Sequence, residues 1–343
     1  FISIFSMLFG AGILLIADRA GPERATRIHY RRMAVLLVIG WIHAHALWSG
    51  DILYTYALCG MAVYPARRLT PRRLIITGLL LHGVSSAFFV VNGVLLRGAP
   101  AEVLAQVTRD YWLSPPADMA REVAAYRGGW LAQQTARGPD ATAMETFIFL
   151  IDSAWKASGL MLVGMALYKL GVLSARRSDA VYRRVVALGF GVGLPVIAYG
   201  AWTNFRAGWT VPYSLFLGSQ YNYWGSVIVA LGWIGLVMLG VRSGRANGMV
   251  TRLAAVGRTA FSNYILQTLL GILIFYGTGL GLFGRVERVG QLLIVFAIWA
   301  VQLVVAPAWL RHYEFGPLEW LWRSLTYGKA QPMRRPALAP APS

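Results

Sequence analysis

The sequence contains little charge and almost no cysteine. Charged residues make up 13% of its 343 residues and hydrophobic residues 57%, whereas an average soluble domain is about 25% charged. A water-soluble protein of this length needs a charged surface, so the composition excludes that class. The single cysteine, Cys59, lies in an apolar run and can form no internal disulfide.

The sequence also lacks the short motifs of several enzyme classes. It contains no Walker A, G-x-S-x-G, H-E-x-x-H or C-x-x-C pattern. ATP-driven transport by this chain alone is therefore not expected.

Long apolar runs take the place of these motifs. A helix of about 20 apolar residues spans the hydrocarbon core of a bilayer, and backbone groups in lipid must bond within their own segment. The sequence thus predicts an all-α, polytopic transmembrane bundle of about nine spans. We place them at 1–17, 33–48, 52–66, 74–96, 146–168, 185–204, 223–241, 259–283 and 289–310.

The net charge of +18 indicates orientation rather than nucleic-acid binding. Most of the 32 Lys and Arg residues fall in alternate short loops and in the C-terminal tail, and such loops stay in the cytoplasm. We therefore expect a cytoplasmic C-terminus and residue 1 at the outer side. The chain opens inside an apolar run without Met, so we also expect natural sequence upstream.

We expect one transmembrane domain over residues 1–330, followed by a tail. The external segment 97–144 has helical apolar spacing with Trp and Tyr, which is typical of helices on the membrane face or over a cavity. Residues 331–343 are rich in Pro and Ala and are predicted to be a disordered cytoplasmic tail.

Candidate catalytic residues lie around a tight turn. His43, His45 and Asp51 fall within WIHAHALWSGDIL, and residues two apart on a helix point about 200° apart. One histidine beside Asp51 could act as a general base. Alternatively, Asp51 caps the next helix while the histidines bond between helices. No metal site is expected, because His-x-His on a helix has poor ligand geometry.

Asp152 and Lys156 are candidates for a polar cavity. They lie four residues apart within one apolar span, acid first, which favours an ion pair on one helix face. Such a pair must face protein or water, or snorkel to the interface. It indicates either a functional cavity or a structural pair.

Two further groups could bind substrates. Arg206, Gln220 and Asn222 lie in an aromatic-rich segment suited to a sugar or lipid head group, although an interfacial aromatic belt has a similar composition. Arg258, Asn263 and Gln267 lie at a cytoplasmic helix start, where an anionic donor could bind.

Several segments resemble the YeiB family of bacterial inner-membrane proteins. They are FSMLFGAG, GDILYTYALCG, and the C-terminal pair RTAFSNYILQT and GPLEWLWRSLTYG. That family is distantly similar to membrane acyltransferases of the acyltransferase-3 and heparan glucosaminide N-acetyltransferase types. The catalytic histidine of the second type lies just upstream of the segment that FSMLFGAG matches, a region that is absent here.

The resemblance implies an acyltransferase-like protein of the bacterial inner membrane. It would move an acyl group from a cytoplasmic acyl-CoA-type donor to an envelope glycan or lipid, without a permanently bound cofactor. A transporter or exporter that uses Asp152 and Lys156 is an alternative. A structural subunit of an envelope complex is another, and the oligomeric state is left open.

Overall fold

The computed structural model describes residues 1–244 and 247–335. Throughout these residues the named elements are helices, and one isolated antiparallel bridge joins Tyr313 and Arg334. The all-α fold predicted from the apolar runs is therefore confirmed. The chain divides into two compact units. Unit 1 comprises Phe1–His29, Ile52–Arg121 and Thr142–Arg245, and unit 2 comprises Tyr30–Asp51, Glu122–Ala141 and Ala246–Ser343.

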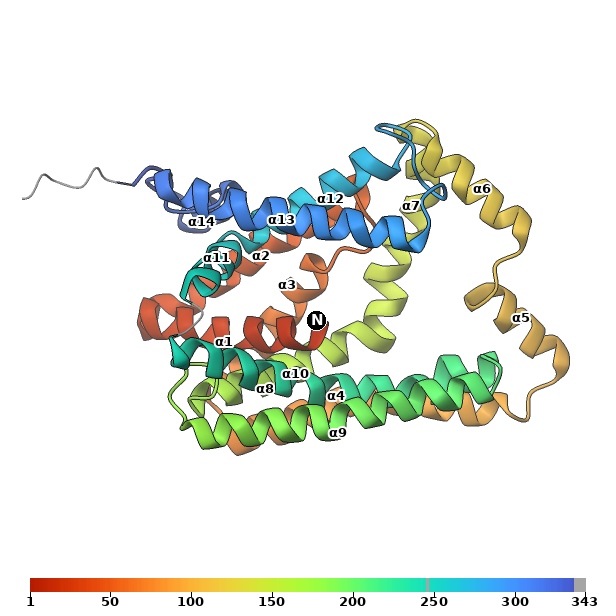
Figure 1. The fold of residues 1–343 in the computed structure, drawn as a ribbon, viewed down its shortest axis with the longest axis horizontal. Helices are drawn as coiled ribbons and strands as arrows, with labels where there is room; N and C mark the ends of the chain where they lie inside the picture. Colours follow the sequence, from red (N-terminus) through yellow and green to blue (C-terminus); the bar gives the residue numbers. More distant parts are fainter. Residues whose placement is uncertain (245–246, 336–343) are drawn as a thin grey trace, which may run out of the picture. The chain divides into compact units, whose positions relative to one another are not determined.

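Unit 1 contains most of the long apolar helices. Its elements are α1 (Ile2–Ala20), the start of α2 (Pro22–Ala46), α3 (Leu53–Val63), the 3₁₀ helix η1 (Tyr64–Arg68), α4 (Pro71–Leu96), α5 (Ala101–Tyr111), the start of α6 (Pro116–Arg127), the π-helix η2 (Met144–Ser153), α8 (Ala154–Lys169), α9 (Asp179–Arg206), the π-helix η3 (Pro212–Leu217) and α10 (Ser219–Ser243). In Figure 1, α9 and α10 run side by side along most of their length.

Glycines let the helices of unit 1 meet backbone to backbone. A Cβ on Gly164 of α8 would lie 1.9 Å from the carbonyl oxygen of Met7 on α1, and a Cβ on Gly10 would lie equally close to that of Met161. The hydrophobic effect does not drive helix association in lipid. Small residues at such crossings instead allow the close van der Waals packing that does. Met7 and Met161, both fully buried, fill the core beside the crossing.

Unit 2 contains one long apolar helix, α13, and several shorter helices. Its elements are the end of α2, the end of α6, α7 (Trp130–Ala143), α11 (Asn247–Arg258), α12 (Ala260–Phe275), α13 (Arg288–His312) and α14 (Pro317–Tyr327). A side chain of α14 fixes the start of α12, because the Glu319 carboxylate accepts hydrogen bonds from the N–H groups of Phe261 (2.7 Å) and Ser262 (3.1 Å). Those groups have no partner within their own helix.

Fewer described segments have the length and apolarity of a membrane span than the nine predicted. Six segments of the described residues are long and apolar enough to cross a bilayer, and they are Ile2–Arg19, Pro71–Leu96, Trp130–Lys169, Asp179–Arg206, Pro212–Ser243 and Arg288–His312. They support a multi-pass membrane protein but not nine spans. The predicted span 52–66 becomes the 11-residue α3 and a 3₁₀ turn, and 259–283 becomes the 16-residue α12. An 11-residue helix rises only about 16 Å. The hydropathy of a sequence does not show where a helix ends within an apolar run.

The segment predicted to be external is helical, and the described part of the tail makes a backbone contact. Segment 97–144 forms α5, α6 and α7, as its spacing predicted. Residues 336–343 of the predicted disordered tail lie outside the described residues. Within the described part of the tail, the Met333 carbonyl oxygen accepts a hydrogen bond from the Glu314 N–H at 3.0 Å.

Candidate functional site

A histidine and a carboxylate meet at the end of α2. The N–H groups of Leu47 and Trp48 both donate to the carbonyl oxygen of His43 at 2.9 Å, which ends the helix and turns the chain. The turn returns Asp51 to His43, where Oδ1 lies 2.7 Å from Nδ1. The two side chains are only 2% and 1% exposed. The structure thus brings together two of the three predicted catalytic residues.

Helix α12 adds two hydroxyl groups to this pair. Thr268 Oγ1 lies 3.0 Å from His43 Nε2, and the Tyr264 hydroxyl donates to Asp51 Oδ1 at 3.2 Å. Tyr264 and Thr268 are four residues apart, so they share one face of α12. An ionised carboxylate only accepts, so Nδ1 of a neutral His43 carries the proton and Nε2 accepts from Thr268. Asp51 therefore fixes the tautomer in which Nε2 is basic.

A cavity of about 630 Å³ borders this cluster. Trp48, Gln267, Gly271, Ile272, Phe275, Tyr276, Phe283, Gly284 and Gln291 line it together with Tyr264 and Thr268. Its volume lies within the range of small-molecule sites, and mostly apolar walls with a few polar groups are typical of them. The cavity can therefore hold an aliphatic or amphiphilic group against Thr268.

His45 occupies a different environment. Its ring centroid lies 5.1 Å from that of Trp41, one turn earlier in α2. The buried Arg137 of α7 donates to the carbonyl oxygens of His45 (3.3 Å) and Leu47 (3.0 Å), and so holds the end of α2. His43 contacts Asp51 directly, and a catalytic role for His45 stays a prediction.

Two of the three predicted donor-binding residues line cavities, and each lines a different one. Gln267 lines the cavity beside Thr268, and its amide donates to Gln302 at 2.9 Å. The side chain of Asn263 donates to Thr259 at 2.9 Å within the start of α12. These two amides stabilise helix contacts, and their role in binding a donor stays a prediction.

Arg258 lies at the second cavity, which is strongly basic. This cavity has a volume of about 780 Å³ and is lined by the arginines Arg252, Arg258, Arg311 and Arg335 and by apolar residues of α13. Arg258 also donates to the carbonyl oxygen of Glu314 at 3.1 Å. Four guanidinium groups around one hollow can bind a group with several phosphates.

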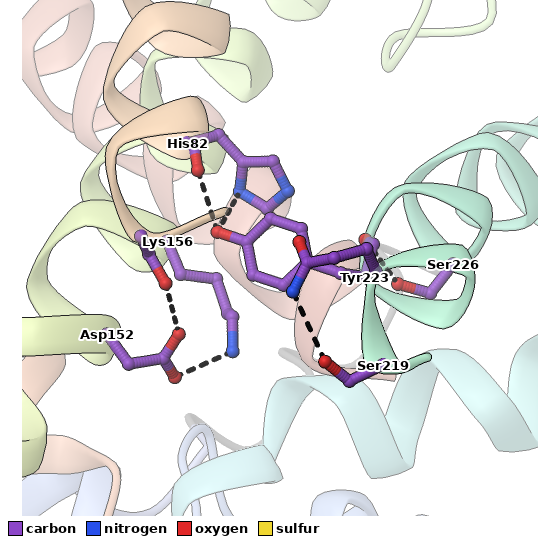
Figure 2. Close-up of polar contacts among 8 residues, drawn as sticks. His82, Asp152, Lys156, Ser219, Tyr223 and Ser226 are labelled. Atoms are coloured by element: carbon purple, nitrogen blue, oxygen red, sulfur yellow. Dashed lines mark hydrogen bonds and ion pairs between the residues drawn. The ribbon is translucent and has the colours of Figure 1, made fainter. Parts of the chain in front are cut away.

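Unit 1 contains a separate polar network between α4, α8 and α10. Figure 2 shows Lys156 pointing to Asp152, with Nζ 2.7 Å from Oδ2. Ser85 donates to the other carboxylate oxygen at 2.6 Å. The two charged side chains are 30% and 18% exposed. Asp152 belongs to the π-helix η2, a distortion that is frequent at functional sites. The role of this pair as a polar cavity stays a prediction.

His82 is the part of this network that the sequence analysis missed. Its ring stacks on Tyr223 at 4.3 Å, and the Tyr223 hydroxyl donates to the carbonyl oxygen of His82 at 2.7 Å (Figure 2). The side chain is buried, and within the described residues its Nε2 has no hydrogen-bond partner. Lys156 Nζ lies 5.0 Å from the centre of the Tyr223 ring. A polar residue within the apolar run 74–96 was the available signal.

The predicted substrate-binding residues make separate contacts. The guanidinium of Arg206 lies over the ring of Trp202, 4.9 Å from its centre, on its own helix. Gln220 accepts a hydrogen bond from Ser86 of α4 at 2.7 Å, and Asn222 is exposed. Substrate binding by these three residues stays a prediction.

Comparisons with known proteins identify the family. The family described as "Protein of unknown function (DUF418)" matches residues 167–329. "Uncharacterized protein YeiB" of Escherichia coli (strain K12) is 29% identical over 338 residues, which cover 97% of this chain and 83% of that protein. "Uncharacterized protein YxaH" of Bacillus subtilis (strain 168) is 30% identical over 342 residues, which cover 97% and 81%. No solved structure matches the chain significantly. The motifs and these comparisons agree: the chain belongs to the YeiB family of uncharacterised proteins.

Proposed function

We propose that this membrane protein transfers acyl groups, with His43 as the general base and Asp51 as the residue that orients it. The observation that carries the proposal is the buried contact of 2.7 Å between His43 Nδ1 and Asp51 Oδ1, beside a cavity that Thr268 lines. A neutral imidazole held in one tautomer can remove a proton from a hydroxyl or amine as it attacks a thioester carbonyl. The carboxylate stabilises the imidazolium that forms.

The two cavities of unit 2 suit the two parts of an acyl-CoA-type donor. The basic cavity has four arginines for phosphate groups, and the cavity beside Thr268 has apolar walls for an acyl chain. Residues of α12 line the cavity beside Thr268, and residues of α11, the helix before α12, line the basic cavity. The rise of α12 from Ala260 to Thr268 is about 12 Å, a length that an extended thiol arm can bridge. The acceptor is an envelope glycan or lipid in this proposal.

We also propose that the C-terminus and the arginine-rich loops face the cytoplasm, in a bacterial inner membrane. The excess of Lys and Arg in alternate loops supports this orientation. Cys59 is buried, so we expect a maleimide to label the introduced cysteines and not the native one. Ala117→Cys and Thr210→Cys should react with a membrane-impermeant maleimide in intact cells, and Ser178→Cys only after lysis. The reverse labelling would invert the orientation.

Thiol release tests the transfer activity. The purified chain in liposomes receives acetyl-CoA or palmitoyl-CoA together with an extract of envelope glycans and lipids, and free CoA is followed with a thiol reagent. We expect acceptor-dependent release that His43→Gln abolishes while the protein stays folded. An absence of release with both donors, or equal release by the wild type and His43→Gln, would overturn the proposal.

A second candidate function is transport through unit 1. The specific observation is the partly exposed Asp152–Lys156 pair within a membrane-spanning segment, since charges at this depth commonly mark solute or proton pathways. Liposomes with a pH-sensitive dye inside report proton movement. A flux that the double change Asp152→Asn and Lys156→Gln removes, but His43→Gln does not, would favour transport.

A further inference from the structure

Thr268, His43 and Asp51 lie in a row of hydrogen bonds. Thr268 Oγ1 is 3.0 Å from His43 Nε2, and His43 Nδ1 is 2.7 Å from Asp51 Oδ1. A hydroxyl, an imidazole and a carboxylate in this order form the arrangement that activates a hydroxyl for attack on carbonyl carbon, and it occurs on unrelated folds. Such an arrangement is identified by the geometry of its side chains, not by their positions in the sequence.

We propose that Thr268 is a nucleophile that carries the acyl group as an ester between two half-reactions. The inference rests on the proposed acyl transfer and deepens it, because it divides the transfer into acylation of the protein and transfer to the acceptor. His43 is then the base for Thr268 first and for the acceptor second.

The hydrogen-bonding geometry separates Thr268 from an ordinary helix threonine. Its hydroxyl lies 3.5 Å from the carbonyl oxygen of Tyr264 one turn earlier, but 3.0 Å from His43 Nε2. Thr326 of α14 shows the ordinary pattern, with its hydroxyl donating to the Trp322 carbonyl at 2.7 Å. The closer acceptor of Thr268 is therefore a base.

The surroundings of the carboxylate hold it in place beside His43. Tyr264 donates to the same Asp51 oxygen that accepts from His43, and the His43 and Asp51 side chains are almost fully buried. In a site with little water, a fixed carboxylate stabilises imidazolium more than it would in solvent. Proton transfer from Thr268 to His43 becomes less unfavourable for this reason.

Thr268 is also reachable. It lines the cavity of about 630 Å³, whose other lining groups are mostly apolar. Trp48, Gln267 and Gln291 add polar side chains to the same wall, and groups of this kind can hold a carbonyl oxygen. The cavity therefore gives an acyl chain access to the hydroxyl.

The two steps balance. Thr268 Oγ attacks the thioester carbonyl and its proton moves to His43 Nε2, after which the C–S bond breaks and the thiolate leaves with that proton. The acceptor hydroxyl or amine then attacks the Thr268 ester while His43 takes its proton. The ester C–O bond breaks, and His43 returns the proton to Thr268. No oxidant or reductant takes part.

A fluorophosphonate with a long alkyl chain tests this inference without a known substrate. The purified full-length chain in detergent is treated with the probe, and peptides are mapped by mass spectrometry. We expect one adduct per chain, on Thr268. The labelling rate should fall at least about 100-fold in His43→Gln, and Thr268→Ser should keep the reaction. Thr326→Val is the matched control for removal of a buried threonine hydroxyl in unit 2 and should label as the wild type does.

The outcomes separate this inference from the proposed function. The inference is overturned if no adduct forms on Thr268, if His43→Gln labels at the wild-type rate, or if Thr268→Val releases CoA as fast as the wild type. The last outcome leaves His43 as the base in a direct transfer. Unfolding temperatures of all variants are measured, and Thr268→Ser shows whether the hydroxyl rather than the side-chain volume matters.

Discussion

The two units of this protein use their helices in different ways. In unit 1, glycines such as Gly164 and Gly10 bring helix backbones into contact. In unit 2, Gly271 has nothing within 4 Å of where a Cβ would be, and it lines a cavity instead. Close packing gives rigidity but no room for a ligand. Unit 2 therefore has the room for a ligand that the proposed function requires.

The two buried histidines show the same contrast. His43 in unit 2 has a polar side chain at each ring nitrogen, and one of these side chains lines a cavity. His82 in unit 1 stacks on Tyr223 and meets Trp224 edge to face, and its Nε2 lacks a partner in the described part of the chain. Both side chains are buried, yet of the two only His43 contacts a hydroxyl that lines a cavity.

The largest expected effect concerns these histidines. His43→Gln should lower acyl transfer by about 10²–10⁴-fold, the range that a positioned acid–base group contributes. His82→Gln should leave the rate per folded molecule unchanged, because the ring contacts Tyr223 and Trp224 within unit 1. CoA release by equal amounts of folded protein is the measurement. A greater loss of CoA release in His82→Gln than in His43→Gln would place the active site in unit 1 and contradict the contrast between the two histidines.

Helix packing should give the next effect. Gly164→Ala should destabilise the protein by about 3 kcal/mol, because the new methyl group meets the carbonyl of Met7 and a backbone cannot rotate away. Gly271→Ala should be nearly neutral for stability, since its surroundings are open. Thermal unfolding in detergent compares the two. Equal unfolding temperatures would show that unit 1 is no more tightly packed than unit 2.

The ion pair of unit 1 should show coupling. Asp152→Asn alone should cost about 1–3 kcal/mol, because the amide replaces one of the two carboxylate oxygens that accept from Lys156 and Ser85 with a donor and leaves the charge of Lys156 unpaired. The double change of Asp152→Asn and Lys156→Gln should cost less, since no charge remains unpaired. If the single and double variants unfold at the same temperature, the residues are independent and the network is not a structural unit.

The smallest effect concerns the side-chain bonds that hold unit 2. Glu319→Gln should cost about 1 kcal/mol, because the carboxylate that accepts from the first N–H groups of α12 loses its charge. Glu287→Gln is the control, since Glu287 precedes α13 without a capping bond from its side chain. A comparable shift in the control would assign the effect to surface charge instead.

The sequence predicts the fold class and part of the site. Apolar runs identify the helices, and the short spacing of His43 and Asp51 limits how far apart they can be. Thr268 is 225 residues from His43, and no pattern in one sequence shows which helix faces meet. His82 was missed although the rule that selected Asp152 applies to it. The span count was too high because hydropathy does not report the 3₁₀ turn of η1 or the early end of α12.

The separation of His43 from Thr268 along the chain also determines when the cluster can form during translation. Ribosomes add about 5–20 residues per second, so the 225 residues between the two side chains take at least about ten seconds to synthesise. During that interval the imidazole can already meet Asp51, while the hydroxyl and the helix that carries it do not yet exist. Glu319, which fixes the start of that helix, is made later still. The cluster is therefore completed only after Thr268 and Glu319 have been synthesised, and under the proposed function a nascent chain stalled earlier transfers no acyl group.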